Sequence, residues 1–220
     1  MSEDFKKVAI LLSGRGSNFV ALSEAIEKGE IPARIVLVFS NRPDAQGLEK
    51  ARQKECPTAC IPPEGRGRES YDRLVVEALQ KAGAEVICLA GYMRILSPVL
   101  VRAFPERILN IHPSLLPSFT GLHAQRQALQ WGARVSGCTV HLVDEELDHG
   151  PIILQHPVPV LDGDTEESLS ERILVHEHEI YPQALRIVCQ GRYRIEGRRV
   201  IVEQKESGIR SQESGRRGIE

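Results

Sequence analysis

The stretch LNIHP, residues 109–113, places an amide and an imidazole two positions apart. Residues 107–112, RILNIH, predict a β-strand, so alternation sends Asn110 and His112 to one side and Ile111 into the core. An amide N–H can donate to a developing oxyanion, and an imidazole can transfer a proton near neutral pH. The pair therefore suits acyl-type transfer, although a histidine at a strand end is often only structural.

A third group for this chemistry stands in the segment DEELDHGP, residues 144–151. We expect Asp148 beside His112, where its charge would favour the imidazolium, raise the pKa of His112 and make a general acid available. Two other interpretations remain: a solvated acidic loop of Asp144, Glu145, Glu146 and Asp148, or a metal site of His141, Asp144, Asp148 and His149. No i, i+4 histidine pair or cysteine couple supports the metal site, and we predict none.

The loop SGRGSN, residues 13–18, follows an apolar strand and precedes a helix. It begins like the dinucleotide fingerprint G-x-G-x-x-G but has Phe19 at the third glycine position. Strand two ends at Ser40 and Asn41, where that motif needs an acid, and no P-loop lysine follows. The turn can instead hold one phosphate monoester with backbone N–H groups at the helix start. The alternative is an ordinary turn capped by Ser17 or Asn18.

The elements around these motifs alternate between strands and helices, which predicts a doubly wound α/β fold with a mostly parallel twisted sheet. The expected strands are 7–12, 33–41, 58–61, 84–91 and 107–112, and the expected helices are 19–28, 45–54 and 68–83. Residues 113–121 predict a loop and residues 123–132 a short helix. Residues 135–144 and 151–160 predict two β segments around an acidic turn, an antiparallel extension.

The final helix is expected to begin with a capping box of Asp164 and Glu167. Its buried face would carry Leu169, Ile173, His176 and Ile180. Residues 192–203 predict a hairpin turning at Glu196–Gly197, and the polar residues 204–220 a disordered tail. We expect one domain over 1–203, with a phosphate-binding half at about 7–105 and a catalytic half at about 106–190.

The composition limits the classes of partner. The 28 basic and 30 acidic residues give a formal charge of −2, so nothing indicates a strong attraction to nucleic acid or to membranes. No apolar stretch is long enough for a membrane span, and no signal peptide is expected. The near-neutral charge favours small ligands, and the five cysteines fit reduced thiols in a cytoplasmic protein.

Six segments in this order resemble the phosphoribosylglycinamide formyltransferases, folate-dependent enzymes of purine synthesis: SGRGSN, FSN, AGYMRILSP, LNIHPSLLPSFTGLHAQRQAL, GCTVHLVDEELDHGPIILQ and HEHEIYP. The match covers about residues 7–190 and implies the Rossmann-like formyltransferase fold. It also implies formyl transfer from 10-formyltetrahydrofolate, as co-substrate, to the amine of glycinamide ribonucleotide, without a metal. Gln125 departs from the histidine that many members carry.

The resemblance also implies residue roles. The catalytic group would be Asn110, His112 and Asp148. The ribonucleotide would contact Gly16, Ser17, Asn18 and Glu177. The formylfolate would contact Arg68, Met93, Arg94, Ile95, Leu96 and Asn110, although Ile95 and Leu96 could be core residues and Arg68 a solvated one.

Three other functions stay open. A formyltetrahydrofolate hydrolase shares the catalytic group but usually has an additional N-terminal domain, whereas here the fold is expected to start by Val8. A methionyl-tRNA formyltransferase needs a C-terminal RNA-binding domain, which thirty trailing residues are not expected to supply. The third is a non-catalytic nucleotide- or folate-binding protein. The oligomeric state is expected to be monomer or homodimer.

Overall fold

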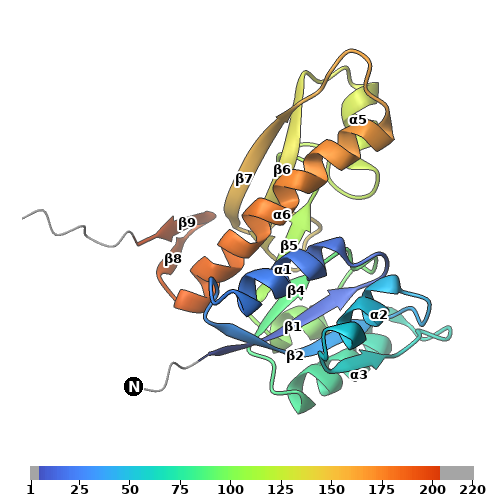
Figure 1. The fold of residues 1–220 in the computed structure, drawn as a ribbon, viewed down its shortest axis with the longest axis vertical. Coiled ribbons are helices and arrows are strands. Elements are labelled where there is room, and N and C mark those ends of the chain that lie inside the picture. The colour runs from blue at the N-terminus through green and yellow to red at the C-terminus, as the bar shows by residue number, and fades with distance from the viewer. Residues whose placement is uncertain (1–4, 204–220) are drawn as a thin grey trace, which may run out of the picture.

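The computed structural model describes residues 5–203, which form a central sheet with helices packed on both faces (Figure 1). The expectation of a disordered tail at 204–220 lies outside the described residues. In chain order the elements are β1 (Lys6–Leu12), α1 (Ser17–Glu27), β2 (Ala33–Ser40), α2 (Gln46–Gln53), β3 (Thr58–Cys60), α3 (Arg68–Lys81), β4 (Val86–Leu89), α4 (Pro98–Ala103), β5 (Ile108–His112), α5 (Ala124–Gln130), β6 (Val135–Leu142), β7 (Ile152–Pro159), α6 (Glu166–Gln190), β8 (Tyr193–Glu196) and β9 (Arg199–Val202).

The strands form one nine-stranded sheet in the order β3-β2-β1-β4-β5-β6-β7-β9-β8. β1 to β5 pair in parallel, and β6 and β7 continue the sheet antiparallel. The predicted fold class, a mostly parallel sheet with an antiparallel extension, is therefore confirmed. The strand order reverses between β1 and β4, and in open α/β sheets ligands bind beyond the strand ends at such a point.

Two hydrophobic cores cover the two faces of the sheet, and strand alternation divides β1 between them. Val8, Ile10 and Leu12 pack in the core that includes α1, α2 and α6. Ala9 and Leu11 pack in the core that includes α3 and α4. Burial on both sides explains why β1 is apolar at every position after its two lysines.

The last helix, α6, differs from its prediction at two points. Its capping box is formed by Thr165 and Ser168, not by Asp164 and Glu167. Asp164 instead accepts two hydrogen bonds from Arg172. His176 is only half-buried, whereas its neighbour Glu177 is buried. Both residues follow the stripe of Leu169, Ile173 and Ile180 by helical spacing, and the packing of α6 buries Glu177.

Two further details were not predicted. The short helix α4 follows Ser97 and begins at Pro98, a residue that favours a first helical position. The C-terminal hairpin turns at Gly197–Arg198, one residue later than expected, because Glu196 still pairs with Arg199. β9 joins the sheet through one register pair with β7, Ile152 and Arg199.

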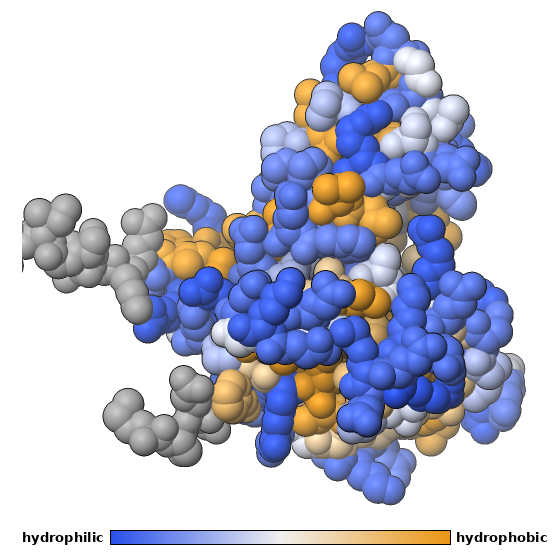
Figure 2. Space-filling model, in the orientation of Figure 1, coloured by the Kyte–Doolittle hydropathy of each residue, from blue (hydrophilic) through white to orange (hydrophobic). Residues whose placement is uncertain are grey.

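The surface over α1, α2 and α6 is mostly hydrophilic, with smaller apolar patches between the helices (Figure 2). No helix within residues 5–203 combines the length and the apolar character needed to cross a bilayer.

Candidate active site

The loop after β1 is built around Gly16, at the point where the strand order reverses. Gly16 has φ 69°, and a Cβ there would lie 2.6 Å from Gly47 Cα, at the start of α2. A Cβ on Gly14, by contrast, would have no heavy atom within 4 Å. Only glycine therefore fits at position 16, where the backbone conformation and the close approach of α2 act together.

Gly16 is also the N-cap of α1, and no side chain caps this helix. The cap expected at Ser17 or Asn18 in the alternative interpretation is therefore wrong, because Gly16 occupies the cap position. Val20 N donates the first hydrogen bond of the helix, to Gly16 O. The N–H groups of residues 17–19 come before it in the chain and have no acceptor within the helix. A helix start of this kind attracts anions through its N–H groups and its dipole.

Asn18 connects this loop to α6. Its Nδ2 donates to Glu177 Oε2 at 2.7 Å, and both side chains are buried. Burial raises the pKa of the Glu177 carboxyl, while the Asn18 hydrogen bond acts in the opposite direction. Four residues beyond Glu177, Tyr181 OH donates to Leu89 O, at the last residue of β4, and to Leu109 O, at the second residue of β5. These contacts fix α6 to the glycine loop at Asn18 and to the neighbouring strands β4 and β5.

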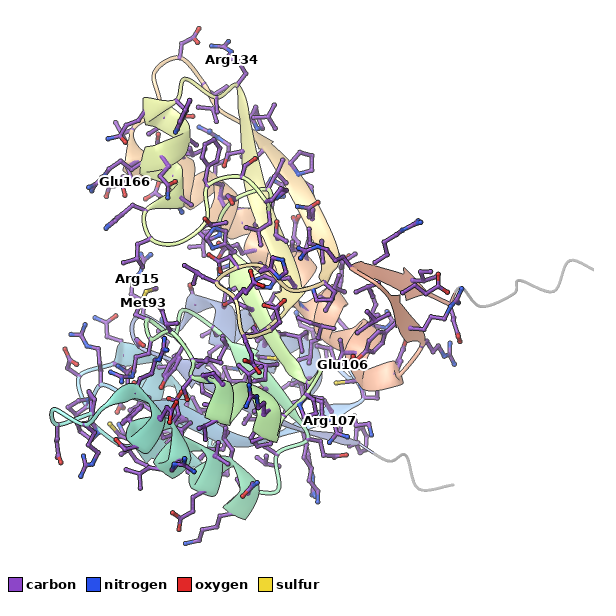
Figure 3. The ribbon with its side chains drawn as sticks, turned by 180° about the vertical axis from the view of Figure 1, so that it is seen from behind. Arg15, Met93, Glu106, Arg107, Arg134 and Glu166 are labelled. Carbon is purple, nitrogen blue, oxygen red and sulfur yellow. The ribbon has the colours of Figure 1, made fainter. Side chains whose placement is uncertain are left out.

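The loop after β4 lies directly beside the glycine loop. Ser13 N donates to Gly91 O, and Met93 N donates to Ser13 Oγ at 2.8 Å. The two loops therefore lie side by side, and Arg15 and Met93 label them in the reverse view (Figure 3). Met93 is 68 % exposed and Ile95 57 % exposed, so the core interpretation of Ile95 is wrong.

The other residues of this proposed folate segment differ in their placement. Leu96 is buried in the core with α3 and α4, as the alternative interpretation had it. The Arg94 guanidinium lies over the Tyr71 ring at 4.3 Å. Arg68 is exposed at the first residue of α3, and no side-chain contact of it with the other candidates is recorded in the described residues. Buried Asp72, which sequence reasoning missed, accepts from Ser97 N at 2.6 Å and holds the end of the segment.

His112 and Asp148 meet as the sequence predicts. His112 Nδ1 lies 3.4 Å from Asp148 Oδ2, and the two side chains are 6 % and 8 % exposed. His112 Nε2 lies 2.8 Å from Phe119 O. Both ring nitrogens thus lie near oxygen atoms, one of a carboxylate and one of a backbone carbonyl. Asp148 Oδ2 also accepts from Gly121 N at 2.7 Å, which links the carboxylate to the loop after β5.

His141 is a second residue that sequence reasoning missed, since it entered only as a disfavoured metal ligand. It pairs directly with Asn110 across β5 and β6, and Asn110 Nδ2 lies 3.2 Å from His141 Nε2. His141 Nδ1 donates to Leu142 O, so Nε2 is the acceptor for the amide. Desolvation lowers the pKa of His141, which keeps the ring neutral. The register of the antiparallel pair was the missing signal.

The C-terminal hairpin contacts the segment that carries Asp148. Arg198 Nη2 donates to His149 O, and Arg198 Nη1 contacts His149 Nε2. His149 Nδ1 in turn donates to Asp144 Oδ2 at 2.7 Å. Asp148 itself has φ 51°, a left-handed conformation that Asp tolerates better than most residues. The hairpin thus contacts the residue that directly follows Asp148, and so supports the position of the Asp148 carboxylate.

Comparisons with known proteins agree with this architecture. The formyl transferase family model matches residues 6–185. Phosphoribosylglycinamide formyltransferase of Escherichia coli K12 is 44 % identical over 86 % of this chain and 89 % of its own length. The trifunctional purine biosynthetic protein adenosine-3 of Bos taurus is 46 % identical, and this chain spans only 19 % of its length. This chain spans 14 % of the length of the Drosophila pseudoobscura protein of the same name.

Solved structures agree as well. Glycinamide ribonucleotide transformylase 1 from Symbiobacterium toebii superposes with a TM-score of 0.90 at 48 % identity, over 93 % of this chain and 96 % of that one. A formyltetrahydrofolate deformylase from Pseudomonas syringae gives a TM-score of 0.86 at 29 % identity, over 91 % of this chain and 67 % of its own. The chain therefore belongs to the formyl transferase family and, within it, to the phosphoribosylglycinamide formyltransferases.

Proposed function

We propose that this protein transfers the formyl group of 10-formyltetrahydrofolate to the amine of glycinamide ribonucleotide, giving formylglycinamide ribonucleotide and tetrahydrofolate in purine synthesis. The observation that carries the proposal is the buried contact between His112 and Asp148 beside Asn110, at the same sheet edge as the Gly16–Asn18 loop. The name of the Escherichia coli relative supports the choice of substrates.

In the proposed reaction the substrate amine attacks the formyl carbon, and a C–N bond forms as the carbonyl oxygen becomes an oxyanion. Asn110 and the His112 imidazolium stabilise this oxyanion. The intermediate then collapses: the bond to the folate nitrogen breaks, that nitrogen takes a proton from His112, and the amine proton leaves through water ordered by Asp148. His112 Nε2 now contacts the backbone carbonyl of Phe119. For Nε2 to act on the substrate, this carbonyl must move away from it.

Two binding regions accompany the catalytic group. Gly16, Ser17 and Asn18 hold the ribonucleotide phosphate, and Glu177 contacts the same substrate. Met93, Arg94, Ile95 and Leu96 lie along the folate, with Arg68 as a further contact. Because Arg94 is directed to Tyr71 and Leu96 into the core, these two act through their backbone. The proposal also includes one domain over residues 1–203, with a phosphate-binding half at about 7–105 and a catalytic half at about 106–190. It further includes a cytoplasmic location and a monomer or homodimer that binds no nucleic acid.

One assay tests the substrates. The purified protein is mixed with glycinamide ribonucleotide and 10-formyltetrahydrofolate, and tetrahydrofolate and the formylated nucleotide are both followed. We expect equal amounts of the two products. Free formate without formylated nucleotide would make the protein a hydrolase, the function that the Pseudomonas syringae likeness favours as second candidate. Ligand binding without turnover would identify a non-catalytic binding protein.

A further inference from the structure

Three side chains outside the proposed reaction meet between the sheet and the last helix. His156 lies on β7, and His176 and Glu179 lie about one turn apart on α6. Each offers one ligand atom, and the three atoms lie within 4.8 Å of one another. The i, i+3 spacing puts the two helical residues on the same face of α6, and α6 packs against β7.

The donor types indicate which ion would fit. The rings of His156 and His176 stack with centroids 3.9 Å apart and planes 13° apart. His176 Nδ1 also donates to Glu179 Oε2 at 2.9 Å. Two imidazoles and one carboxylate suit Zn²⁺ and related ions such as Co²⁺ or Ni²⁺, whereas Mg²⁺ and Ca²⁺ prefer oxygen ligands.

The site is open enough for an ion to enter and for the ligands to adjust. Both histidines are half-buried and Glu179 is exposed. Glu179 also lines a groove of about 470 Å³ between α1 and α6. Nearly parallel rings do not aim their nitrogens at one point, so one ring must rotate about its Cβ–Cγ bond. Such torsions have broad energy wells, which makes the rotation accessible.

We propose that His156, His176 and Glu179 bind one transition-metal ion of the zinc class, with water completing the shell, and that the ion connects α6 to β7. Glu177 is the immediate neighbour of His176 but turns inward to Asn18. The ion would therefore hold the helix turn that carries the proposed ribonucleotide contact, without joining the transfer reaction.

Calorimetric titration of the chelator-treated full chain with Zn²⁺ tests this. We expect one ion per chain, with His156→Ala and His176→Ala each weakening binding by about tenfold or more, the scale on which metal-site residues act. Glu171→Gln, an exposed acid on the same helix, and His123→Ala, an exposed histidine elsewhere, are matched controls that should change it by less than about twofold.

Two measurements keep the result unambiguous. The exposed variant Glu179→Gln should weaken Zn²⁺ binding while keeping the circular dichroism spectrum of the unchanged protein, so a folding defect in a histidine variant cannot mimic the result. Cys56 and Cys60 are half-buried free thiols and could bind the ion instead. The Co²⁺ spectrum distinguishes the two sites, because the proposed ligands contain no thiolate and should give no thiolate charge-transfer bands. Absence of binding, thiolate bands, or equal affinity in the three variants and the controls would overturn the proposal.

Discussion

Asp148 Oδ2 lies 3.4 Å from His112 Nδ1, and almost no water reaches either side chain. Electrostatic interactions in such a place are stronger than in water, because the surroundings screen them less. Asp148 sits in a left-handed backbone conformation, one residue before the segment that Arg198 contacts. The placement of Asp148 beside His112 thus depends on a loop that two other parts of the chain contact, at Gly121 and at Arg198.

The two members of this pair should both be needed for turnover. His112→Ala removes the proposed acid, and Asp148→Asn removes the charge but keeps a residue that tolerates positive φ. We expect each change to lower kcat by about 100-fold or more, the usual size of general-acid effects. Steady-state kinetics measure this, with thermal melting to confirm folding. Activity within a few fold of the unchanged protein would remove that residue from the mechanism.

Asn110 and His141 should behave as one unit. Asn110→Ala deletes the proposed oxyanion donor and should lower kcat by about 100-fold or more. His141→Ala leaves the donor but frees its orientation, so a smaller loss of about tenfold is expected. Kinetics of the double variant are decisive, because a loss no greater than that of Asn110→Ala alone is expected for coupled residues. Full additivity would mean that His141 acts elsewhere.

Glu177 makes stability depend on pH. Burial raises its pKa in the folded state, so between the unfolded and folded pKa values the folded chain binds more protons. Stability contributed by this group therefore falls as pH rises through that window. We expect Glu177→Gln to raise Tm, with a larger gain at pH 8 than at pH 5, and to raise KM for the ribonucleotide. An equal gain at both pH values would contradict the assignment.

The two glycines of the first loop should differ sharply. Gly16→Ala forces a Cβ to within 2.6 Å of Gly47 Cα at φ 69°, and should cost about 1–3 kcal/mol in the free energy of unfolding. Gly14→Ala, at a position with open space, is the matched control and should be nearly neutral. Urea unfolding of the two variants measures the difference, and equal stabilities would exclude the close approach of α2.

The hairpin contact should affect catalysis from outside the catalytic group. Arg198→Ala frees the carbonyl of His149, so we expect kcat to fall by about 3- to 10-fold, with smaller changes in KM, from misplacement of Asp148. Arg194→Ala is the control on the same hairpin, because within residues 5–203 the Arg194 side chain forms an ion pair with Glu196 alone. If the two variants have the same kcat, Arg198 does not support the loop.

Local patterns were sufficient for much of the fold. The apolar run of β1, the stripe of α3 and the turn residues around α5 carry their structure in their own sequence, because burial and periodicity decide it. The pairing of Asn110 with His141 was not accessible in this way, since it depends on the register between two strands. The same holds for Asp72 and Ser97, which meet only when α3 and α4 pack.

The site shows the same division. Alternation placed Asn110 and His112 on one side, and the glycine loop pointed to an anion. The meeting of His112 with Asp148 was expected from chemical need and from resemblance, not from spacing. The burial of Glu177, where His176 was expected to be buried, depends on how α6 packs. A helical stripe alone does not decide which of two neighbouring residues is buried.

The two outer strands of the sheet have a consequence for how copies of this protein meet. β3 has only three residues, and β8 has four, of which Arg194 and Glu196 are exposed. Short or charged edge strands discourage pairing with a strand of another molecule. Pairing with a strand of another molecule is therefore disfavoured along β3 and along β8, the two strands that end the order of the sheet.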